Sequence, residues 1–218
     1  MTKPVSGPAD DIEKRRRFLR QQAIQAREAL DEAQRARLTV RLAGHLGGVI
    51  DELAPRTLAF CWPFRAEPDL RDWVRDWLAG DAQRVAALPV VVAAGTAMHF
   101  RRWTPGAGMV LDRHGIPHPA TPEEVAPEVV LVPLNAFDAA GYRLGYGGGY
   151  FDRTLAGMDV IAVGAGFELG RVPSVLPQPH DRPMDWIVTE AGAARAGAVH
   201  TGAAHAGSAC DGAERAVR

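Results

Sequence analysis

The segment Val129-Val-Leu-Val132, followed closely by Gly141-Tyr-Arg-Leu-Gly-Tyr-Gly-Gly-Gly-Tyr-Phe-Asp-Arg153, carries most of the information about the fold. Four consecutive apolar residues without polar alternation are typical of a strand that is buried on both faces, as in a parallel sheet covered by helices. The glycine-rich segment follows the C-terminal end of this predicted strand, which is where open α/β sheets bind their ligands. Together the two features predict an α/β fold with a ligand-binding loop at one edge of its sheet.

The rest of the chain repeats this alternation of strand and helix signals. Apolar runs predict five more strands, at residues 57–62, 85–92, 97–103, 160–166 and 186–189. Helices are predicted at 12–29 and from about 31 to 50, which contain no proline, and at 68–78, where apolar residues recur at spacings of three and four. Asp31 is the predicted N-cap of the second helix. The chain is therefore predicted to form a single α/β domain with a mostly parallel central sheet flanked by helices.

Composition and charge exclude several classes of protein. Apolar residues make up 47% of the 218 residues, which excludes global disorder. The net charge of −1 argues against a protein built mainly to bind nucleic acid. The longest apolar run, residues 85–95, is too short to cross a bilayer, and the first residues do not form a secretory signal. Cys61 and Cys210, the two cysteines, make neither a disulfide framework nor a zinc site. We expect a cytoplasmic protein with no membrane or nucleic-acid partner.

The two ends of the chain differ in composition from its centre. Residues 1–11 are rich in proline, glycine, serine and aspartate and are predicted to be a flexible leader. Residues 191–218 are mostly alanine and glycine, with too little bulk for a core, and are predicted to be a disordered tail. The predicted domain therefore comprises residues 12–190.

The residues of the glycine-rich loop are suited to phosphate binding. Gly145 and the three glycines from Gly147 to Gly149 leave backbone N–H groups free to approach an anion closely. Arg143 supplies a planar cation suited to phosphate oxygens, and Asp152 supplies an oxygen ligand for Mg²⁺ beside a phosphate. The loop matches neither of the common nucleotide-binding glycine motifs, so a flexible turn is the alternative interpretation of the glycines.

The segment from Gly141 to Arg153, with Val132-Pro133 and Ala136-Phe-Asp138 before it, resembles the signature of the 5-formyltetrahydrofolate cyclo-ligases, also called methenyltetrahydrofolate synthetases. The resemblance extends over roughly residues 14–190. It implies a fold related to the sugar-phosphate isomerase and CoA-transferase group. It also implies a reaction in which ATP and Mg²⁺ convert 5-formyltetrahydrofolate to 5,10-methenyltetrahydrofolate, with release of ADP and phosphate through a phosphorylated formyl intermediate.

The resemblance also implies which residues bind ATP. In the N-terminal helix the family carries Lys-x-x-Leu-Arg and a further arginine seven positions on, and this chain has Arg16, Leu19-Arg20 and Arg27 at those positions. The alternative for these arginines is a solvated basic face, which is the expectation for their neighbours Arg15 and Arg17. The complete set implied for ATP is Arg16, Arg20, Arg143, Leu144, Gly145, Tyr146, Gly147, Gly148, Gly149, Tyr150 and Phe151.

The folate and metal sites are implied in the same way. Trp62 and Glu67 follow the first predicted strand, where an aromatic face and a carboxylate suit a pterin ring. The set implied for the folate substrate is Trp62, Glu67, Tyr146, Gly147, Gly148, Gly149 and Tyr150. Asp152 and Asp181, far apart in the sequence, are the implied Mg²⁺ ligands.

Two positions depart from the family pattern and leave a second interpretation open. Arg16 stands where the family usually has lysine, and His118 stands where it more often has an acid. A histidine in a proline-rich loop is expected to be exposed. The alternative is a non-catalytic homologue that binds nucleotide or folate for regulation. In either case we expect small-molecule partners and a monomer.

Overall fold

The strand β6 (Val129–Pro133) lies at the centre of a seven-stranded sheet in this computed structural model, which describes residues 8–197. The strand order is β11 (Gly192–Arg195), β10 (Trp186–Thr189), β9 (Ile161–Ala165), β6, β1 (Thr57–Ala59), β2 (Val85–Val90) and β3 (His99–Trp103). The five strands from β10 to β2 are parallel, and β11 and β3 pair antiparallel at the two edges. The predicted mostly parallel α/β sheet is confirmed.

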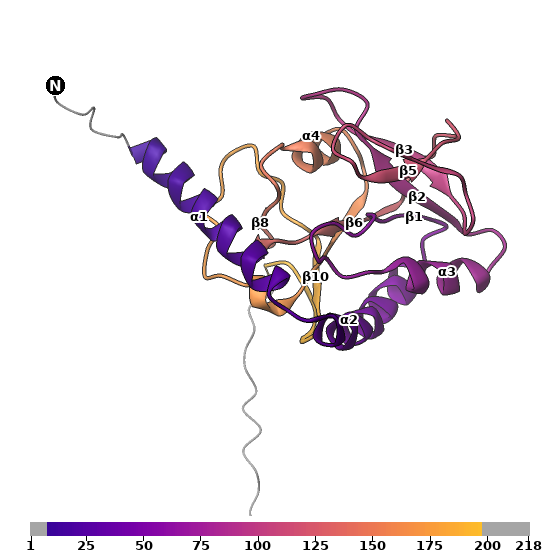
Figure 1. Cartoon of the computed structure of the whole chain (residues 1–218), viewed down its shortest axis with the longest axis horizontal. Helices are drawn as coiled ribbons and strands as arrows, with labels where there is room; N and C mark the ends of the chain where they lie inside the picture. The colour runs from indigo at the N-terminus through magenta and orange to yellow at the C-terminus, as the bar shows by residue number, and fades with distance from the viewer. Residues whose placement is uncertain (1–7, 198–218) are drawn as a thin grey trace, which may run out of the picture.

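The apolar run in β6 is buried on both faces, as its lack of alternation predicts. Val129 and Leu131 belong to one core cluster, and Val130 and Val132 belong to another on the opposite face. Helices α2 (Glu32–Leu53) and α3 (Arg71–Ala79) contribute to the first cluster, and α4 (Tyr150–Ala156) contributes to the second. The sheet is therefore covered by helices on both sides (Figure 1).

The first two helices agree with the sequence prediction except at the start of the first. Asp31 caps α2 in a capping box, accepting a hydrogen bond from the backbone N–H of Gln34 while the Gln34 side chain accepts one from the backbone of Asp31. The preceding helix, α1, spans Pro8–Glu28. Residues 8–11, predicted to be part of a flexible leader, therefore belong to this helix, with a proline at its beginning where proline is tolerated.

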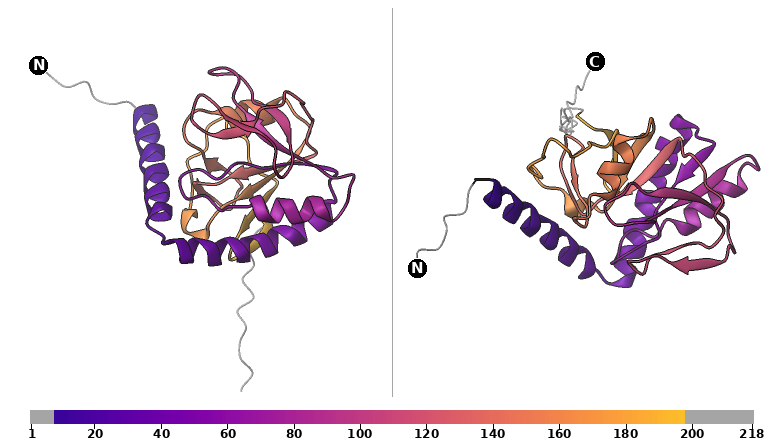
Figure 2. Two further views of the ribbon diagram at one scale, coloured as in Figure 1. Left: turned by 45° about the vertical axis from the view of Figure 1, so that its right-hand side comes forward. Right: turned by 90° about the horizontal axis from the view of Figure 1, so that it is seen from above.

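Helix α1 packs away from the main sheet. Its residues Leu19 and Ala23 join a small cluster with Leu144 and Val175, beside the two-stranded sheet of β7 (Ala136–Phe137) and β8 (Arg143–Leu144). Figure 2 shows α1 standing along one side of the body and turning sharply into α2. One face of α1 therefore lies against the segments that follow β6.

Several short strands were not predicted from the sequence. Besides β7 and β8 these are β4 (Met109–Leu111) and β5 (Pro117–Pro119), each too short for a hydrophobic pattern to reveal. The strand β11 lies in the segment predicted to be a disordered tail, so that prediction was wrong for residues 192–195. Its residues Gly192, Ala193 and Ala194 are too small to give a hydrophobic pattern, and backbone hydrogen bonds to β10 hold the strand in place. The predicted tail from residue 198 onward lies outside the described residues. A short 3₁₀ helix, η1 (Glu168–Gly170), follows β9.

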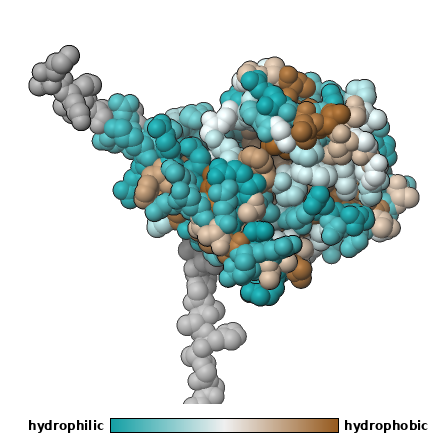
Figure 3. Space-filling model, viewed as in Figure 1, coloured by the Kyte–Doolittle hydropathy of each residue, from teal (hydrophilic) through white to brown (hydrophobic). Residues whose placement is uncertain are grey.

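The surface is hydrophilic along α1 and more mixed over the body (Figure 3). Among the described residues, none of the helices has the length and apolar character needed to traverse a bilayer. Cys61 is a free thiol whose pKa is raised by burial, and Cys210 lies outside residues 8–197.

Candidate functional site

Two loops meet where the direction of sheet winding reverses. From β1 the chain continues through α3 to β2 on one side of the sheet, whereas from β6 it continues through α4 to β9 on the other. Since β1 and β6 are parallel neighbours, the loops after their carboxyl ends lie side by side at this switch point, where α/β proteins bind ligands. One loop carries Trp62 and Glu67, and the other carries the glycine-rich segment.

The glycine loop requires glycine at several of its positions. Gly147 and Gly149 have φ of 94° and 63°, in the left-handed region that other residues rarely adopt, and Gly149 is the N-cap of α4. At Gly148 a Cβ atom would lie 2.8 Å from the ring of Tyr150. The glycines therefore form a tight turn that leads directly into a helix.

A cleft of about 780 Å³ opens beside this turn. It is lined by predicted residues, Gly147, Gly148, Gly149, Asp152 and Asp181, and by others that the sequence reasoning missed, Arg153, Ala156, Pro179, His180, Arg182 and Pro183. Asp152 and Asp181, which are 29 positions apart in the sequence, therefore line the same cleft. Arg153 and Arg182 each follow one of these acids directly in the sequence, and this position could have identified them as residues of the cleft.

Arg16 and Asp181 are joined to each other by a buried ion pair. Arg16 Nη1 and Nη2 donate to Asp181 Oδ2 and Oδ1 at 2.6 and 3.0 Å, and Nη1 also donates to the carbonyl of Leu176. Burial opposes ionisation of Asp181, but the hydrogen bonds from Arg16 and from the backbone N–H of Gln178 outweigh it and lower the pKa of this carboxyl. The pair ties the N-terminal half of α1 to the far wall of the cleft.

The Arg16–Asp181 pair predicts a pH-dependent contribution to stability. Because the folded-state pKa of Asp181 is lowered, its stabilisation is fully present above the pKa of an unfolded aspartate and is lost progressively as the pH falls from there through the folded-state pKa. Replacing Arg16 with methionine leaves a buried carboxylate unpaired, and we expect it to lower the free energy of unfolding by about 3 kcal/mol at pH 7. The difference from the wild type should shrink markedly at pH 3.5, as measured by urea unfolding at both values.

Lys14→Met is the matched control on the same helix, since Lys14 makes an exposed ion pair with Asp11. We expect it to change stability by less than about 1 kcal/mol at either pH. An Arg16→Met variant whose loss is equally large at pH 3.5 would show that packing of the arginine, rather than its pairing, is responsible.

Arg143 and Asp152 form a second ion pair beneath the glycine loop. Arg143 is only 4% exposed and donates from Nη1 to Asp152 Oδ1 at 3.0 Å and to the carbonyl of Arg182. The backbone N–H of Arg182 donates to the same Oδ1 atom. Oδ2 of Asp152 has no hydrogen-bond partner among residues 8–197. The structure therefore places Arg143 behind the cleft wall, where it orients a carboxylate with one free oxygen.

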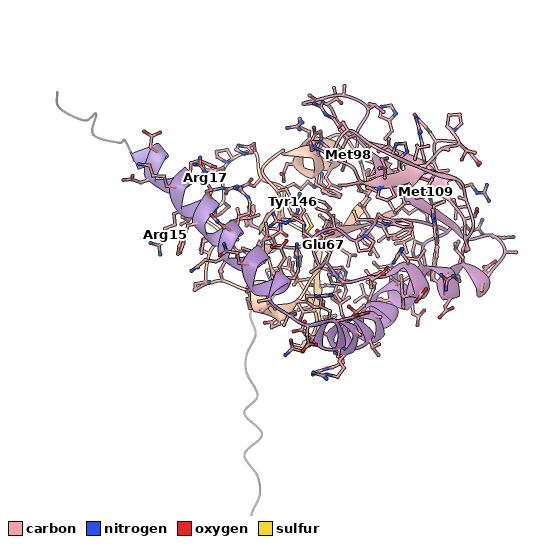
Figure 4. All side chains as sticks on the ribbon, in the orientation of Figure 1. Arg15, Arg17, Glu67, Met98, Met109 and Tyr146 are labelled. Atoms are coloured by element: carbon pink, nitrogen blue, oxygen red, sulfur yellow. The ribbon has the colours of Figure 1, made fainter. Side chains whose placement is uncertain are left out.

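Arg20 lies against the outer side of the same loop. Its Nε donates to the carbonyl of Gly145 at 2.7 Å, and its guanidinium lies beside Gly147, 3.7–3.9 Å from where a Cβ would be. Burial lowers the pKa of Arg20. The bond to Gly145 is the only hydrogen bond of the Arg20 side chain within the described part of the chain, so both of its Nη groups are available to a ligand. Arg15 and Arg17 are exposed on α1 (Figure 4), as expected for solvated neighbours.

Arg27, Tyr146 and Glu67 form a network that crosses from α1 to both loops. Arg27 Nη2 donates to the hydroxyl of Tyr146 at 2.8 Å, and that hydroxyl donates to Glu67 Oε1 at 2.7 Å. Burial raises the pKa of Glu67, although the hydrogen bond from Tyr146 and the charge of Arg27 oppose this shift. Burial and the neighbouring Glu67 raise the pKa of Tyr146 as well. Figure 4 shows Tyr146 and Glu67 close together between α1 and the sheet.

The remaining predicted residues surround this network and the glycine loop. The guanidinium of Arg71 lies over Trp62, 4.6 Å from the ring centroid, so one face of this aromatic is covered. Tyr150 packs edge-to-face against His114, with their polar atoms 3.3 Å apart. Leu144 is buried in the α1 cluster, and Phe151 lies near the guanidinium of Arg143.

His118 is buried, which contradicts the expectation that it would be exposed. It lies in β5, and its Nδ1 is 3.0 Å from the carbonyl of Pro119. His118 belongs to the β4–β5 hairpin, which the prolines concealed in the sequence, and β5 packs against β2 and β3 of the main sheet.

The fold and cleft define the class of α/β proteins that bind ligands at the switch point of a mostly parallel sheet. Residues 12–190 match the sequence model of the 5-formyltetrahydrofolate cyclo-ligase family. The chain therefore belongs to this family, and the resemblance drawn from the glycine-rich segment is confirmed.

Individual relatives agree with this assignment. The 5-formyltetrahydrofolate cyclo-ligase of Mycolicibacterium smegmatis is 32% identical over 182 residues, which cover 78% of this chain and 91% of that protein. The enzyme of the same name from Escherichia coli K12 is 33% identical over 139 residues, 60% of this chain and 74% of that protein.

Solved structures agree as well. The NMR structure of the Aquifex aeolicus 5,10-methenyltetrahydrofolate synthetase superposes with a TM-score of 0.73 at 26% identity, covering 88% of this chain and 97% of that one. A 5,10-methenyltetrahydrofolate synthetase from Mycoplasma pneumoniae has the same fold, with a TM-score of 0.64 at 22% identity, over 80% of this chain and 98% of that one.

Proposed function

We propose that this chain catalyses the ATP- and Mg²⁺-dependent cyclisation of 5-formyltetrahydrofolate to 5,10-methenyltetrahydrofolate, releasing ADP and phosphate. The observation that carries the proposal is the juxtaposition of the glycine-lined cleft, with Asp152 in its wall, and the buried carboxylate of Glu67 across the switch point. The reaction needs two neighbouring sites, one for phosphate groups and one for a ring that carries N–H donors. The family of the chain and the names of its relatives support this assignment.

ATP is proposed to bind in the cleft beside the glycine loop. A volume of about 780 Å³ is within the usual range for small-molecule sites. The backbone of Gly147 to Gly149 and the free Nη groups of Arg20 would contact the phosphates. Arg143 would act by holding Asp152, and Arg16 by holding the far wall through Asp181. The neighbouring residues Leu144, Gly145, Tyr146, Tyr150 and Phe151 complete the proposed nucleotide site.

The folate is proposed to bind across the loop, with its pterin ring near Glu67. A pterin presents ring and amino N–H groups, which a carboxylate accepts well. Each oxygen of Glu67 receives one hydrogen bond from the protein, from Tyr146 or from the backbone of Phe64, and retains a lone pair for a ligand. Trp62, Tyr146 and Tyr150, with the glycines between, would border the substrate.

The acidic residues fit a magnesium ion that arrives with the nucleotide. No cluster of three or more metal-binding side chains exists within residues 8–197. Mg²⁺ in nucleotide sites needs only one or two carboxylates because phosphates and waters supply the other ligands. Asp152, with its free Oδ2, fits this role. Asp181 as a second ligand stays a prediction, and it requires that the carboxylate release Arg16.

The proposed reaction proceeds by phosphoryl transfer. The formyl oxygen attacks the γ-phosphorus and ADP leaves. N10 then attacks the activated formyl carbon, and the new carbon–nitrogen bond closes the ring. N10 loses its proton, and the carbon–oxygen bond breaks as phosphate departs with the former formyl oxygen. The protein's residues bind, orient and exclude water, and no side chain is assigned as a general base. Mg²⁺, when bound, would offset the negative charge of the phosphates.

An absorbance assay tests the proposal. Pure protein is mixed with 5-formyltetrahydrofolate, Mg²⁺ and ATP, and formation of the methenyl product is followed by its absorbance. We expect product to form with one ADP released for each ring closed, and none to form without ATP. Folate binding without turnover would contradict the enzyme assignment and favour the regulatory homologue.

A further inference from the structure

Arg27 is the most deeply buried cation among the residues that the structure describes, at 2% exposure, and it contacts segments from three parts of the chain. From the last turn of α1 it donates to the carbonyl of Arg65 after β1, to Leu134 and Asn135 after β6, and to Tyr146 in the glycine loop. Burying a charge is costly unless it is fully hydrogen-bonded, and here every nitrogen of the guanidinium donates. Such a residue fixes the relative positions of both loops.

The chemistry of the groups determines where the proton of Tyr146 points. A guanidinium can only donate, so the oxygen of Tyr146 accepts from Arg27, and its single proton is left for Glu67 Oε1. A second acceptor, the carbonyl of Phe64, lies 3.4 Å from the same hydroxyl. The hydroxyl therefore has two acceptors within reach, and the shorter contact is the one to Glu67.

Tyr146 belongs to the glycine loop by its backbone and to the Glu67 site by its hydroxyl. Its ring also packs edge-to-face against Phe64, 5.4 Å between centroids, and the N–H of Phe64 donates to Glu67 Oε2. Ordering the glycine loop around a nucleotide would therefore also order the turn that carries Glu67. A second ligand that needs the same ordering then binds at a smaller entropic cost.

We propose that Arg27 is a positioning residue that couples nucleotide binding at the glycine loop to pterin binding at Glu67, through Tyr146. The proposal rests on the proposed function, since it assigns these two ligands to the two loops. Each ligand should bind more tightly when the other is present, and linkage requires the two enhancements to be equal.

The test measures the dissociation constant of 5-formyltetrahydrofolate with and without a saturating non-hydrolysable ATP analogue, and then the reciprocal pair, by calorimetry. For the wild type we expect a ratio of about tenfold, within the usual range of coupling between sites. Tyr146→Phe keeps the ring and its packing against Phe64 but removes the hydroxyl link between Arg27 and Glu67, so its ratio should fall well below the wild-type value. Arg27→Met should do the same, and Arg27→Lys should restore part of the coupling because an ammonium can still donate to Tyr146.

Glu28→Gln is the matched control. Glu28 follows Arg27 directly, and its exposed ion pair with Arg65 does not touch Tyr146. This variant should retain the wild-type ratio. If Arg27→Met does not fold, Tyr146→Phe tests the coupling by itself. A purely structural role for Arg27 predicts that the Tyr146→Phe variant keeps the wild-type ratio of dissociation constants.

The outcomes separate this inference from the proposed function. A wild type that turns over its substrates but binds each ligand independently overturns the coupling and leaves the enzyme assignment intact. A Tyr146→Phe variant that keeps a tenfold ratio also overturns it. A wild type that binds neither ligand overturns both proposals.

Discussion

A protein carrying Asp152→Asn is expected to fold normally and to lose at least about a hundredfold in turnover. The amide oxygen of asparagine can still accept hydrogen bonds from Arg143 and from the backbone of Arg182, so the contacts behind the cleft wall survive. The substitution removes the negative charge that would hold Mg²⁺. A contribution of several kcal/mol from a metal ion corresponds to a loss of this size, because about 1.4 kcal/mol is a factor of ten in rate. Initial rates at rising Mg²⁺ concentration measure the effect.

Asp159→Asn is the matched control for this prediction. Asp159 is exposed just beyond α4 and does not line the cleft. Its variant should have the wild-type rate and the wild-type dependence on Mg²⁺. Near-normal turnover by Asp152→Asn at limiting Mg²⁺ would remove Asp152 from the metal site.

A single added methyl group at Gly170 is expected to destabilise the protein by about 3 kcal/mol. In η1 a Cβ atom at this position would lie 2.1 Å from the carbonyl oxygen of Asn135 and 3.4 Å from the ring of Phe137. This carbonyl belongs to Asn135, which lies between β6 and β7 and whose side chain accepts a hydrogen bond from Arg27, so a shift of this backbone would disturb that contact. Gly170→Ala should therefore lower the melting temperature by roughly 10 °C and weaken folate binding.

The opposite result is expected from the same substitution at Gly48. This residue lies in the exposed interior of α2, and a Cβ atom there would meet nothing within 4 Å. Alanine is a better helix former than glycine, so Gly48→Ala should raise stability by about 1 kcal/mol. Thermal unfolding of both variants under one condition makes the comparison. Equal, small effects would show that the contact at Gly170 relaxes easily.

The parallel sheet could be predicted because its strands are apolar on both faces. Continuous apolar runs such as 129–132 and 160–166 are typical of strands in a buried parallel sheet. The absence of proline from residues 12–29 favours a helix there. The short strands could not be predicted. In β7, β8 and β11 the backbone hydrogen bonds of a neighbour hold the segment, and no side-chain pattern records them.

The site was predictable in its loops and less so in its pairings. The position of the glycine turn follows from the strand before it, and the two acids that line the cleft were singled out by Asp152 following the glycines and, for Asp181, by the family resemblance. The sequence does not reveal that Arg16 is matched to Asp181 and Arg143 to Asp152. These pairs join residues from separate elements, and only the packing of α1 against the segment between η1 and β10 brings the first pair together. The buried environment of Arg27 was hidden for the same reason.

The strand β11 has a consequence for how this protein is handled. The match to the family model ends at residue 190, yet the sheet continues for another strand. In β11, Arg195 stacks on Trp186 and forms an ion pair with Glu52 of α2, while the strand backbone covers the outer edge of β10. A chain trimmed at the family boundary would uncover that edge and present its unpaired N–H and C=O groups to other molecules. Such an edge is a template for intermolecular pairing, so a shortened chain invites aggregation.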